Sequence, residues 1–268
     1  MSDNPASGNP GWDPGLYLQF GDERLQPALD LIARIPPVRP GARVVDLGCG
    51  AGNALPALAA RLPGAAVRGV DGSAAMLAKA RATGFATEQA DIARWQPADP
   101  VDVLFSNAAL HWLPDHQALF PRLLGCLAPG GVLAVQMPAM HARPLRAMQD
   151  RIAADGPWAA RLAGVASAPP LLEADEYFGL LRPRVAVLDL WFTEYLHVLR
   201  GPDPVVRWAV GSSLRPYLDA LAAAPDLQDG FVAAYAEAMR VAYPARATDG
   251  SDPVVLLPFR RFFVLASI

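Results

Sequence analysis

Three polar side chains, Asp71, Asp91 and Asn107, stand at or just past the ends of three successive apolar runs. Parallel strands end at one edge of a sheet, where open α/β folds bind their ligands. Asp71 follows a glycine-rich turn by roughly 25 residues, the distance at which a carboxylate accepts both ribose hydroxyls of a nucleotide. Asp91 is then placed to meet an adenine amino group, and Asn107 to face the reacting end of the ligand. One acidic residue alone is as often a helix cap, but three in register with a glycine turn predict a nucleoside cofactor.

The glycine turn itself indicates which cofactor. A Val-rich run ends at Asp46 and leads into Gly48, Gly50 and Gly52, before a helical pattern that starts near Asn53. Glycine is needed where the backbone takes a positive φ or approaches a ligand closely. A dinucleotide site needs G-x-G-x-x-G, with the pyrophosphate on a helix N-terminus. Here the third glycine comes early and no basic residue follows it, which disfavours a nicotinamide-dependent oxidoreductase. The spacing favours a cofactor without phosphate, such as S-adenosyl-L-methionine, with its amino-acid moiety over the turn.

Alternating strands and helices must position these residues. The apolar runs predict strands near 44–47, 67–70, 86–89, 101–107 and 132–137, and helices over 21–34, 53–62, 74–81 and 114–127. Ser73 is a predicted N-cap for the helix over 74–81. Strands that are apolar almost throughout are buried on both faces. The sequence therefore predicts an α/β fold, a doubly wound and mostly parallel sheet.

The pattern changes after Pro138. Residues from about 139 to 183 and from about 202 to 245 are helical and loop-rich. Strands are expected over 185–192, with an alternative end at Leu199, and over 254–265. We interpret the helical stretches as an insertion, or cap, on the substrate side of one domain spanning 15–268. Residues 1–14 are rich in Gly, Pro and Asn, a composition typical of disorder.

Composition limits the classes of partner. The 268 residues are 53% hydrophobic and carry a net charge of −3, which disfavours a nucleic-acid partner. An acidic ligand would need local arginines. The two cysteines lack metal-ligand spacing, and we expect no metal and a reducing, cytoplasmic setting. No apolar run is long enough to span a membrane.

Several motifs support a resemblance to a known family. The segments 46–53, 90–91 and 107–113, together with Asp71, resemble those of class I S-adenosylmethionine-dependent methyltransferases. The chain is also similar, nearly end to end, to trans-aconitate 2-methyltransferases. That closer likeness lies in segments 12–18, 113–116, 135–138, 191–197, 214–216 and 258–263, while residues 142–183 match poorly.

The resemblance implies a Rossmann-like fold and a transferase reaction. A methyl group would pass from S-adenosyl-L-methionine to one carboxylate of trans-aconitate or a close tricarboxylate, giving a monomethyl ester and S-adenosyl-L-homocysteine. A carboxylic acid with a pKa of roughly 4 is already anionic at neutral pH and needs no general base. Catalysis then requires positioning and the exclusion of water.

Arginines are the expected anion binders, because the guanidinium pairs with carboxylates in a bidentate manner. Arg215 and Arg260 stand in family-like motifs, whereas Arg261 is a weaker candidate because neighbouring residues on a strand point to opposite faces. Hydroxyl donors or an apolar lid would come from Tyr17, Trp191, Thr193 and Tyr195, for which core packing is the alternative reading.

His111 follows the predicted strand 101–107 by a few residues. It is placed to hydrogen-bond the substrate, or to act as a base if the substrate were a hydroxyl or an amine. The alternative is that it packs beside Trp112 under the cofactor. Two other functions stay open: methylation of a different small molecule, and a non-catalytic protein that binds S-adenosylmethionine.

Overall fold

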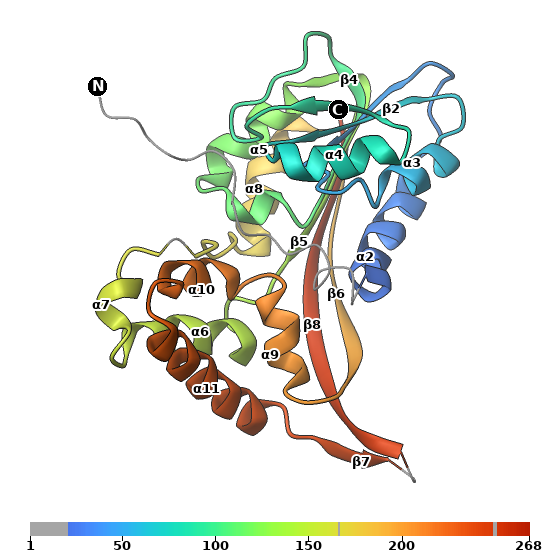
Figure 1. Cartoon of the computed structure of the whole chain (residues 1–268). Coiled ribbons are helices and arrows are strands. Elements are labelled where there is room, and N and C mark those ends of the chain that lie inside the picture. Colours follow the sequence, from blue (N-terminus) through green and yellow to red (C-terminus); the bar gives the residue numbers. More distant parts are fainter. Residues whose placement is uncertain (1–20, 166, 249–250) are drawn as a thin grey trace, which may run out of the picture.

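The computed structural model describes residues 21–165, 167–248 and 251–268. Its strands are β1 (Arg43–Leu47), β2 (Ala66–Asp71), β3 (Ala86–Gln89), β4 (Val101–Asn107), β5 (Leu127–Pro138), β6 (Val187–Arg200), β7 (Arg246–Thr248) and β8 (Ser251–Ser267). They form one sheet in the order β3-β2-β1-β4-β5-β8-β6, with β7 paired to β8 (Figure 1). Residues 1–14, for which the composition predicts disorder, lie outside the described residues.

Strands β1 to β5 are parallel, whereas β8 runs antiparallel to both β5 and β6. The strand order reverses between β1 and β4, which makes the end of β1 the switch point where α/β sheets bind ligands. Both flanking strands are largely buried, as their Val-rich sequences predict. The mostly parallel α/β sheet predicted from the sequence is confirmed.

Helices cover both faces of this sheet. On one face, α2 (Gly21–Arg34), α3 (Leu55–Arg61) and α4 (Ala74–Ala82) pack on side chains such as Val44 and Phe105. On the other, α5 (His116–Leu124) and α8 (Ala174–Leu181) pack on Val45 and Leu104. The doubly wound arrangement is therefore confirmed. Ser73 caps α4 as predicted, its hydroxyl accepting from the Met76 amide.

The helix predicted over 114–127 is present but shorter at both ends. It is α5 (His116–Leu124), and a separate 3-10 helix, η1, spans Leu110–Trp112 before it. Asp115 is the N-cap of α5: its φ is +53°, and its carboxylate accepts the Ala118 amide. An aspartate at this position satisfies a free amide of the first helical turn, so α5 begins at His116.

A second group of helices packs away from the parallel strands. It comprises α6 (Pro144–Ala154), α7 (Ala159–Leu162), α9 (Pro204–Val210), α10 (Arg215–Leu221) and α11 (Pro225–Ala242). These helices lie together beside the far half of β6 and β8 (Figure 1). They share a core of their own that includes Trp158, Trp208, Phe231 and Tyr235. None of the described helices is both long and apolar enough to cross a bilayer.

Strand β8 is longer than predicted, whereas β6 ends within one residue of the longer of its two predicted ends; together the two strands join the two groups of helices. β6 continues to Arg200, and β8 spans Ser251–Ser267 despite Pro258. β5 ends at Pro138, opposite Arg261, so β8 at Pro258 pairs with β6 and no longer with β5. Proline is tolerated where a strand has a free edge.

Candidate active site

The glycine turn after β1 needs its glycines for two different reasons. Gly48, Gly50 and Gly52 have φ values of +81°, +54° and +83°. A Cβ on Gly48 would lie 2.3 Å from the Cβ of Ala109, and one on Gly52 would lie 3.0 Å from the Cβ of Ala80. A Cβ on Gly50 would meet no atom of the described chain within 4 Å. Gly48 and Gly52 therefore let the turn pack closely, whereas Gly50 leaves open space for a ligand.

Asp71 ties this turn to the next helix. One carboxylate oxygen accepts the Gly50 amide at 2.9 Å, and the other accepts the Ser73 amide at 2.8 Å. Each oxygen of a carboxylate has a second lone pair, so both still have capacity for ligand hydroxyls. Asp91 is exposed, and its side chain accepts the Ala93 amide at 2.9 Å. The structure thus brings Asp71 onto the turn, while Asp91 stands at the start of the loop after β3.

Asp46, the last acidic residue before the turn, is only 2% exposed. Burial, and secondarily the charge of Asp71, raises the pKa of the Asp46 carboxyl to about 8. Burial, followed by the charges of Asp46 and Asp71, also raises the pKa of the neighbouring Cys49 thiol. Both groups are therefore mainly neutral at pH 7, and Cys49 is not an activated nucleophile.

A cavity of about 380 Å³ opens beyond the carboxyl end of β4. That volume falls within the range of small-molecule sites. Asn107 and Ala108 line the cavity, and the next residue, Ala109, is the one that Gly48 packs against. The Oδ1 atom of Asn107 is buried and has no hydrogen-bond partner among the described residues. The cavity and the glycine turn are therefore adjacent parts of one site.

Three arginines line this cavity: Arg146 from α6, and Arg260 and Arg261 from β8. We call it the arginine-lined cavity. The guanidinium of Arg260 lies 3.8 Å over the Phe192 ring, and that of Arg261 lies 4.2 Å over the Phe259 ring. Aromatic faces hold these cations in place.

Both β8 arginines reach the cavity, although strand alternation predicts only one. β5 ends opposite Arg261, so beyond this position the cavity is open to both faces of β8, and Phe259 through Phe262 all line it. The expectation that Arg261 points elsewhere is wrong for this reason.

Other substrate-side candidates lie elsewhere. Arg215 is on α10, where its Nε donates to Asp219 at 2.8 Å, and it is not among the residues that line the cavity. Trp191 stacks on Phe263 with ring centroids 4.7 Å apart, on the opposite side of β6 from Phe192. Tyr17 lies outside the described residues.

Two further β6 candidates, Thr193 and Tyr195, lie on the same face of the strand as Trp191. Neither is among the residues that line the cavity. The Tyr195 hydroxyl donates to Asp30 of α2 at 2.6 Å. Trp191 also faces α2, since the Arg34 guanidinium lies 4.1 Å over its ring. This face of β6 anchors helix α2.

His111 lines the cavity beside Trp112, with ring centroids 4.9 Å apart. Its Nδ1 is buried and makes no hydrogen bond within the described part of the chain. Burial, followed by the charges of Arg261 and Arg146, lowers the pKa of His111 to about 3. The imidazole is therefore neutral at pH 7. It can exchange hydrogen bonds with a ligand, but it is a weak base.

Sequence reasoning missed Arg146 and Phe192 as cavity residues. Arg146 stands in the segment 142–183, where no motif drew attention to it. A helix that begins at Pro144 places Arg146 and Gln149 on one face, three residues apart, and this was the available signal. Phe192 could have been found from the alternation along β6, as the residue that faces away from Trp191.

Comparisons with known proteins agree with this geometry. A family model described as a methyltransferase domain matches residues 44–131, which include the glycine turn, Asp71, Asp91 and Asn107. Solved structures share the fold. One is the YcgJ protein of Bacillus subtilis, with a TM-score of 0.56 and 15% identity over 90% of this chain and 98% of that one. Another is a Haemonchus contortus phosphoethanolamine N-methyltransferase, with a TM-score of 0.54 and 17% identity over 94% of this chain and 56% of that one.

Curated relatives are much more similar in sequence. The trans-aconitate 2-methyltransferase of Methylobacterium nodulans is 48% identical over 258 residues, which cover 95% of this chain and 97% of the relative. That of an Azoarcus species is 47% identical, over 96% of this chain and 99% of the relative. With this identity over almost the full length of both proteins, the chain belongs to the trans-aconitate 2-methyltransferase family.

Proposed function

We propose that the protein transfers the methyl group of S-adenosyl-L-methionine to one carboxylate of trans-aconitate, or of a close tricarboxylate. The products are a monomethyl ester and S-adenosyl-L-homocysteine. The observation that carries the proposal is the arginine-lined cavity, which places three cationic side chains next to the glycine turn. The curated relatives carry the name of this activity.

The residues around the turn fit S-adenosylmethionine. The open space above Gly50 accommodates its amino-acid moiety, Asp71 has lone pairs for the ribose hydroxyls, and the unpartnered Asn107 Oδ1 is ready to accept a hydrogen bond. When bound, this cofactor supplies a sulfonium methyl group that an anionic oxygen can attack. Asp91 remains our candidate for the adenine amino group.

A carboxylate substrate suits the groups that this cavity supplies. The acid is already ionised at neutral pH, so the chain must hold the anion and need not remove a proton. Arg260, Arg261 and Arg146 pair with its carboxylates. Neutral His111 adds a hydrogen bond without adding charge. A substrate that needed deprotonation would be poorly served, because a base with a pKa of about 3 accepts few protons at pH 7.

Aromatic rings give the cavity its apolar walls. Phe192 and Phe259 hold Arg260 and Arg261, and Trp112 and Trp208 also line the cavity. Apolar walls exclude water, which strengthens the ion pairs and holds the reactants in line. We assign helices α6, α7, α9, α10 and α11 the role of a cap that completes this wall. Cys49 and Cys126 are both unpaired, which supports a reducing, cytoplasmic setting for the reaction.

The test is to incubate the protein with S-adenosylmethionine and trans-aconitate and to look for a monomethyl ester by mass spectrometry. We expect turnover with trans-aconitate and much slower turnover with phenols and amines of similar size. Faster methylation of a hydroxyl or an amine would overturn the substrate class. Cofactor binding by calorimetry, combined with no turnover over a panel of small acids, would favour a non-catalytic binding protein.

A further inference from the structure

Arg146 is a buried cation with spare hydrogen-bonding capacity. Its side chain projects from the first turn of α6, lines the arginine-lined cavity and is only 6% exposed as a residue. The Nη1 atom donates to the Gln149 side-chain carbonyl at 2.7 Å. The Nη2 atom is buried and makes no hydrogen bond within the described part of the chain. Such a donor is costly unless a ligand or a water molecule satisfies it.

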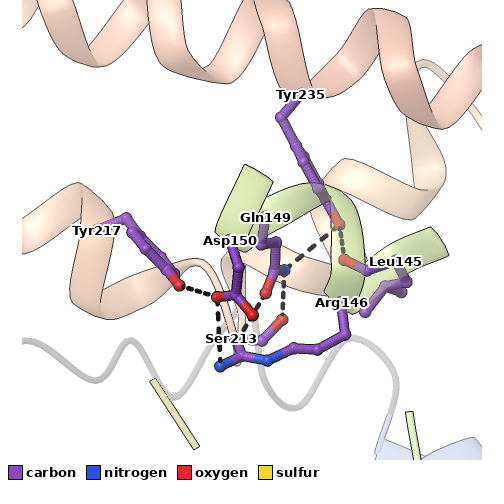
Figure 2. A network of polar contacts seen from close by, with 7 residues as sticks. All are labelled: Leu145, Arg146, Gln149, Asp150, Ser213, Tyr217 and Tyr235. Carbon is purple, nitrogen blue, oxygen red and sulfur yellow. Dashed lines mark hydrogen bonds and ion pairs between the residues drawn. The ribbon is translucent and has the colours of Figure 1, made fainter. Parts of the chain in front are cut away.

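A network of side chains holds this guanidinium in place (Figure 2). The Tyr235 hydroxyl donates its proton to the Leu145 carbonyl at 2.8 Å, so its oxygen acts as an acceptor toward Gln149. The Gln149 Nε2 donates to Ser213 Oγ at 2.7 Å and to the Tyr235 hydroxyl at 3.3 Å. Both acceptors fix the amide orientation, and the carbonyl oxygen of Gln149 must then face Arg146.

Among the described residues, the acidic group paired with Arg146 leaves part of its charge uncompensated. Asp150 Oδ1 lies 3.9 Å from Nη2, too far for a hydrogen bond. The same oxygen accepts the Tyr217 hydroxyl at 2.7 Å. The Asp150 side chain is 37% exposed, so water screens its attraction for Arg146.

We infer that Arg146 is a specificity-determining residue that binds a non-reacting carboxylate of the substrate through Nη2, and that Gln149 positions it. The inference rests on the proposed function, since it assigns one carboxylate of a tricarboxylate to a named arginine. Arg260 and Arg261 come from β8 and serve the other carboxylates. Ser213, which accepts from Gln149, lines the cavity beside this subsite.

The test measures binding directly. Trans-aconitate is titrated by calorimetry into the full-length protein saturated with S-adenosylhomocysteine, alongside three dicarboxylates that each lack one of its carboxylates: itaconate, glutaconate and mesaconate. Arg146→Met is expected to weaken trans-aconitate binding about 30-fold. For the one dicarboxylate that lacks the carboxylate held by Arg146, the same variant is expected to weaken binding less than about 3-fold. Gln149→Met leaves Arg146 charged but removes the side-chain partner that positions it, and should weaken trans-aconitate binding about 5-fold.

Arg143→Met is the matched control. Arg143 precedes α6, pairs with Glu194 at the surface, and does not line the cavity. We expect unchanged affinity for all four acids. Arg146→Lys is a second variant in case the Met variant misfolds, because it keeps the buried charge. A lysine ammonium cannot bind Gln149 and a carboxylate together, so this variant should weaken trans-aconitate binding about 5-fold.

The outcomes separate this inference from the proposed function. If the wild type neither binds nor methylates any of the acids, the proposed function fails. If the wild type methylates trans-aconitate but Arg146→Met and Arg146→Lys bind it normally, only the inference is overturned. Equal loss for all four acids in the folded Arg146→Met protein would also overturn it, because a merely structural role would not distinguish them.

Discussion

The glycine turn and the arginine-lined cavity meet at Ala109, but they are built in opposite ways. The turn is made of backbone, and its three glycines fall within five consecutive residues. The cavity is made of side chains such as Asn107, Arg146 and Arg260, which come from three distant parts of the chain. A common cofactor can be held by a local and reusable turn, whereas the substrate is recognised by contacts that only the complete fold assembles.

The largest expected effect comes from the turn. Gly48→Ala forces a Cβ to within 2.3 Å of Ala109 Cβ at a φ of +81°, and should destabilise the protein by about 2–4 kcal/mol and abolish cofactor binding. Urea unfolding and calorimetry with S-adenosylmethionine measure the two effects. Gly41→Ala is the control, since its φ of +75° is similar but its Cβ would meet nothing within 4 Å. It should cost about 1–2 kcal/mol and leave cofactor affinity unchanged.

Asp71→Ala tests whether a side chain can matter as much as the glycines. Its loss frees the amides of Gly50 and Ser73 and removes the proposed ribose acceptor, so cofactor affinity should fall more than about 100-fold. Asp91→Ala removes one local bond to the Ala93 amide and the one bond proposed to the adenine amino group, and should weaken binding about 10-fold or less. Titration calorimetry with S-adenosylmethionine compares the two, and an equal loss would contradict this ranking.

Arg260→Ala probes the cavity in isolation. We expect the KM for trans-aconitate to rise about 30-fold, with little change in the affinity for S-adenosylmethionine. Arg215→Ala tests the sequence-based expectation against the structure. Because Arg215 pairs with Asp219 and is not among the cavity-lining residues, we expect the KM for trans-aconitate to change less than about 3-fold. Steady-state kinetics decide the point. Equal loss of both affinities in Arg260→Ala would show that the two regions are not separable.

The stability of the fold is expected to depend on pH through Asp46. The pKa of Asp46 is raised to about 8 from an ordinary value of 3.8, so the folded state holds a proton that the unfolded state releases. The stabilising contribution is complete below about pH 4 and is lost as the pH rises toward 8. Asp46→Asn removes this dependence and should gain stability relative to the wild type between pH 5 and 8, by on the order of 1 kcal/mol per pH unit. Urea unfolding of both proteins at the two pH values provides the measurement. If the stabilities of the wild type and of Asp46→Asn changed equally with pH, the raised pKa of Asp46 would be contradicted.

The same contrast explains how much could be read from the sequence. The positions of the parallel strands, the two-sided helix cover and the Ser73 cap follow from apolar runs and local capping chemistry, which act over a few residues. The helix Gly21–Arg34 has the predicted bounds. The start of α5 was placed two residues too early, because the left-handed backbone of Asp115, a non-glycine residue, leaves little trace in composition.

The substrate side was harder to predict for a physical reason. Arg260 was found through a motif, but Arg146 is defined by its contacts with Gln149 and the cavity, which depend on how α6 packs against α11. Alternation along a strand correctly separates Trp191 from Phe192. It fails at Arg261, because the neighbouring strand β5 ends there and opens both faces.

The place of β8 within the sheet also bears on how the chain folds. β8 lies between β5 and β6, and Pro138 pairs with Arg261 more than 120 positions away. Closing so long a loop costs entropy before any contact rewards it, so long-range pairing is slow. The parallel strands can assemble earlier through local βα units and leave the edge of β5 exposed until β8 docks. An exposed edge is a template for aggregation, so we expect β8 docking, which completes the substrate site, to be a late step of folding that is open to misassembly.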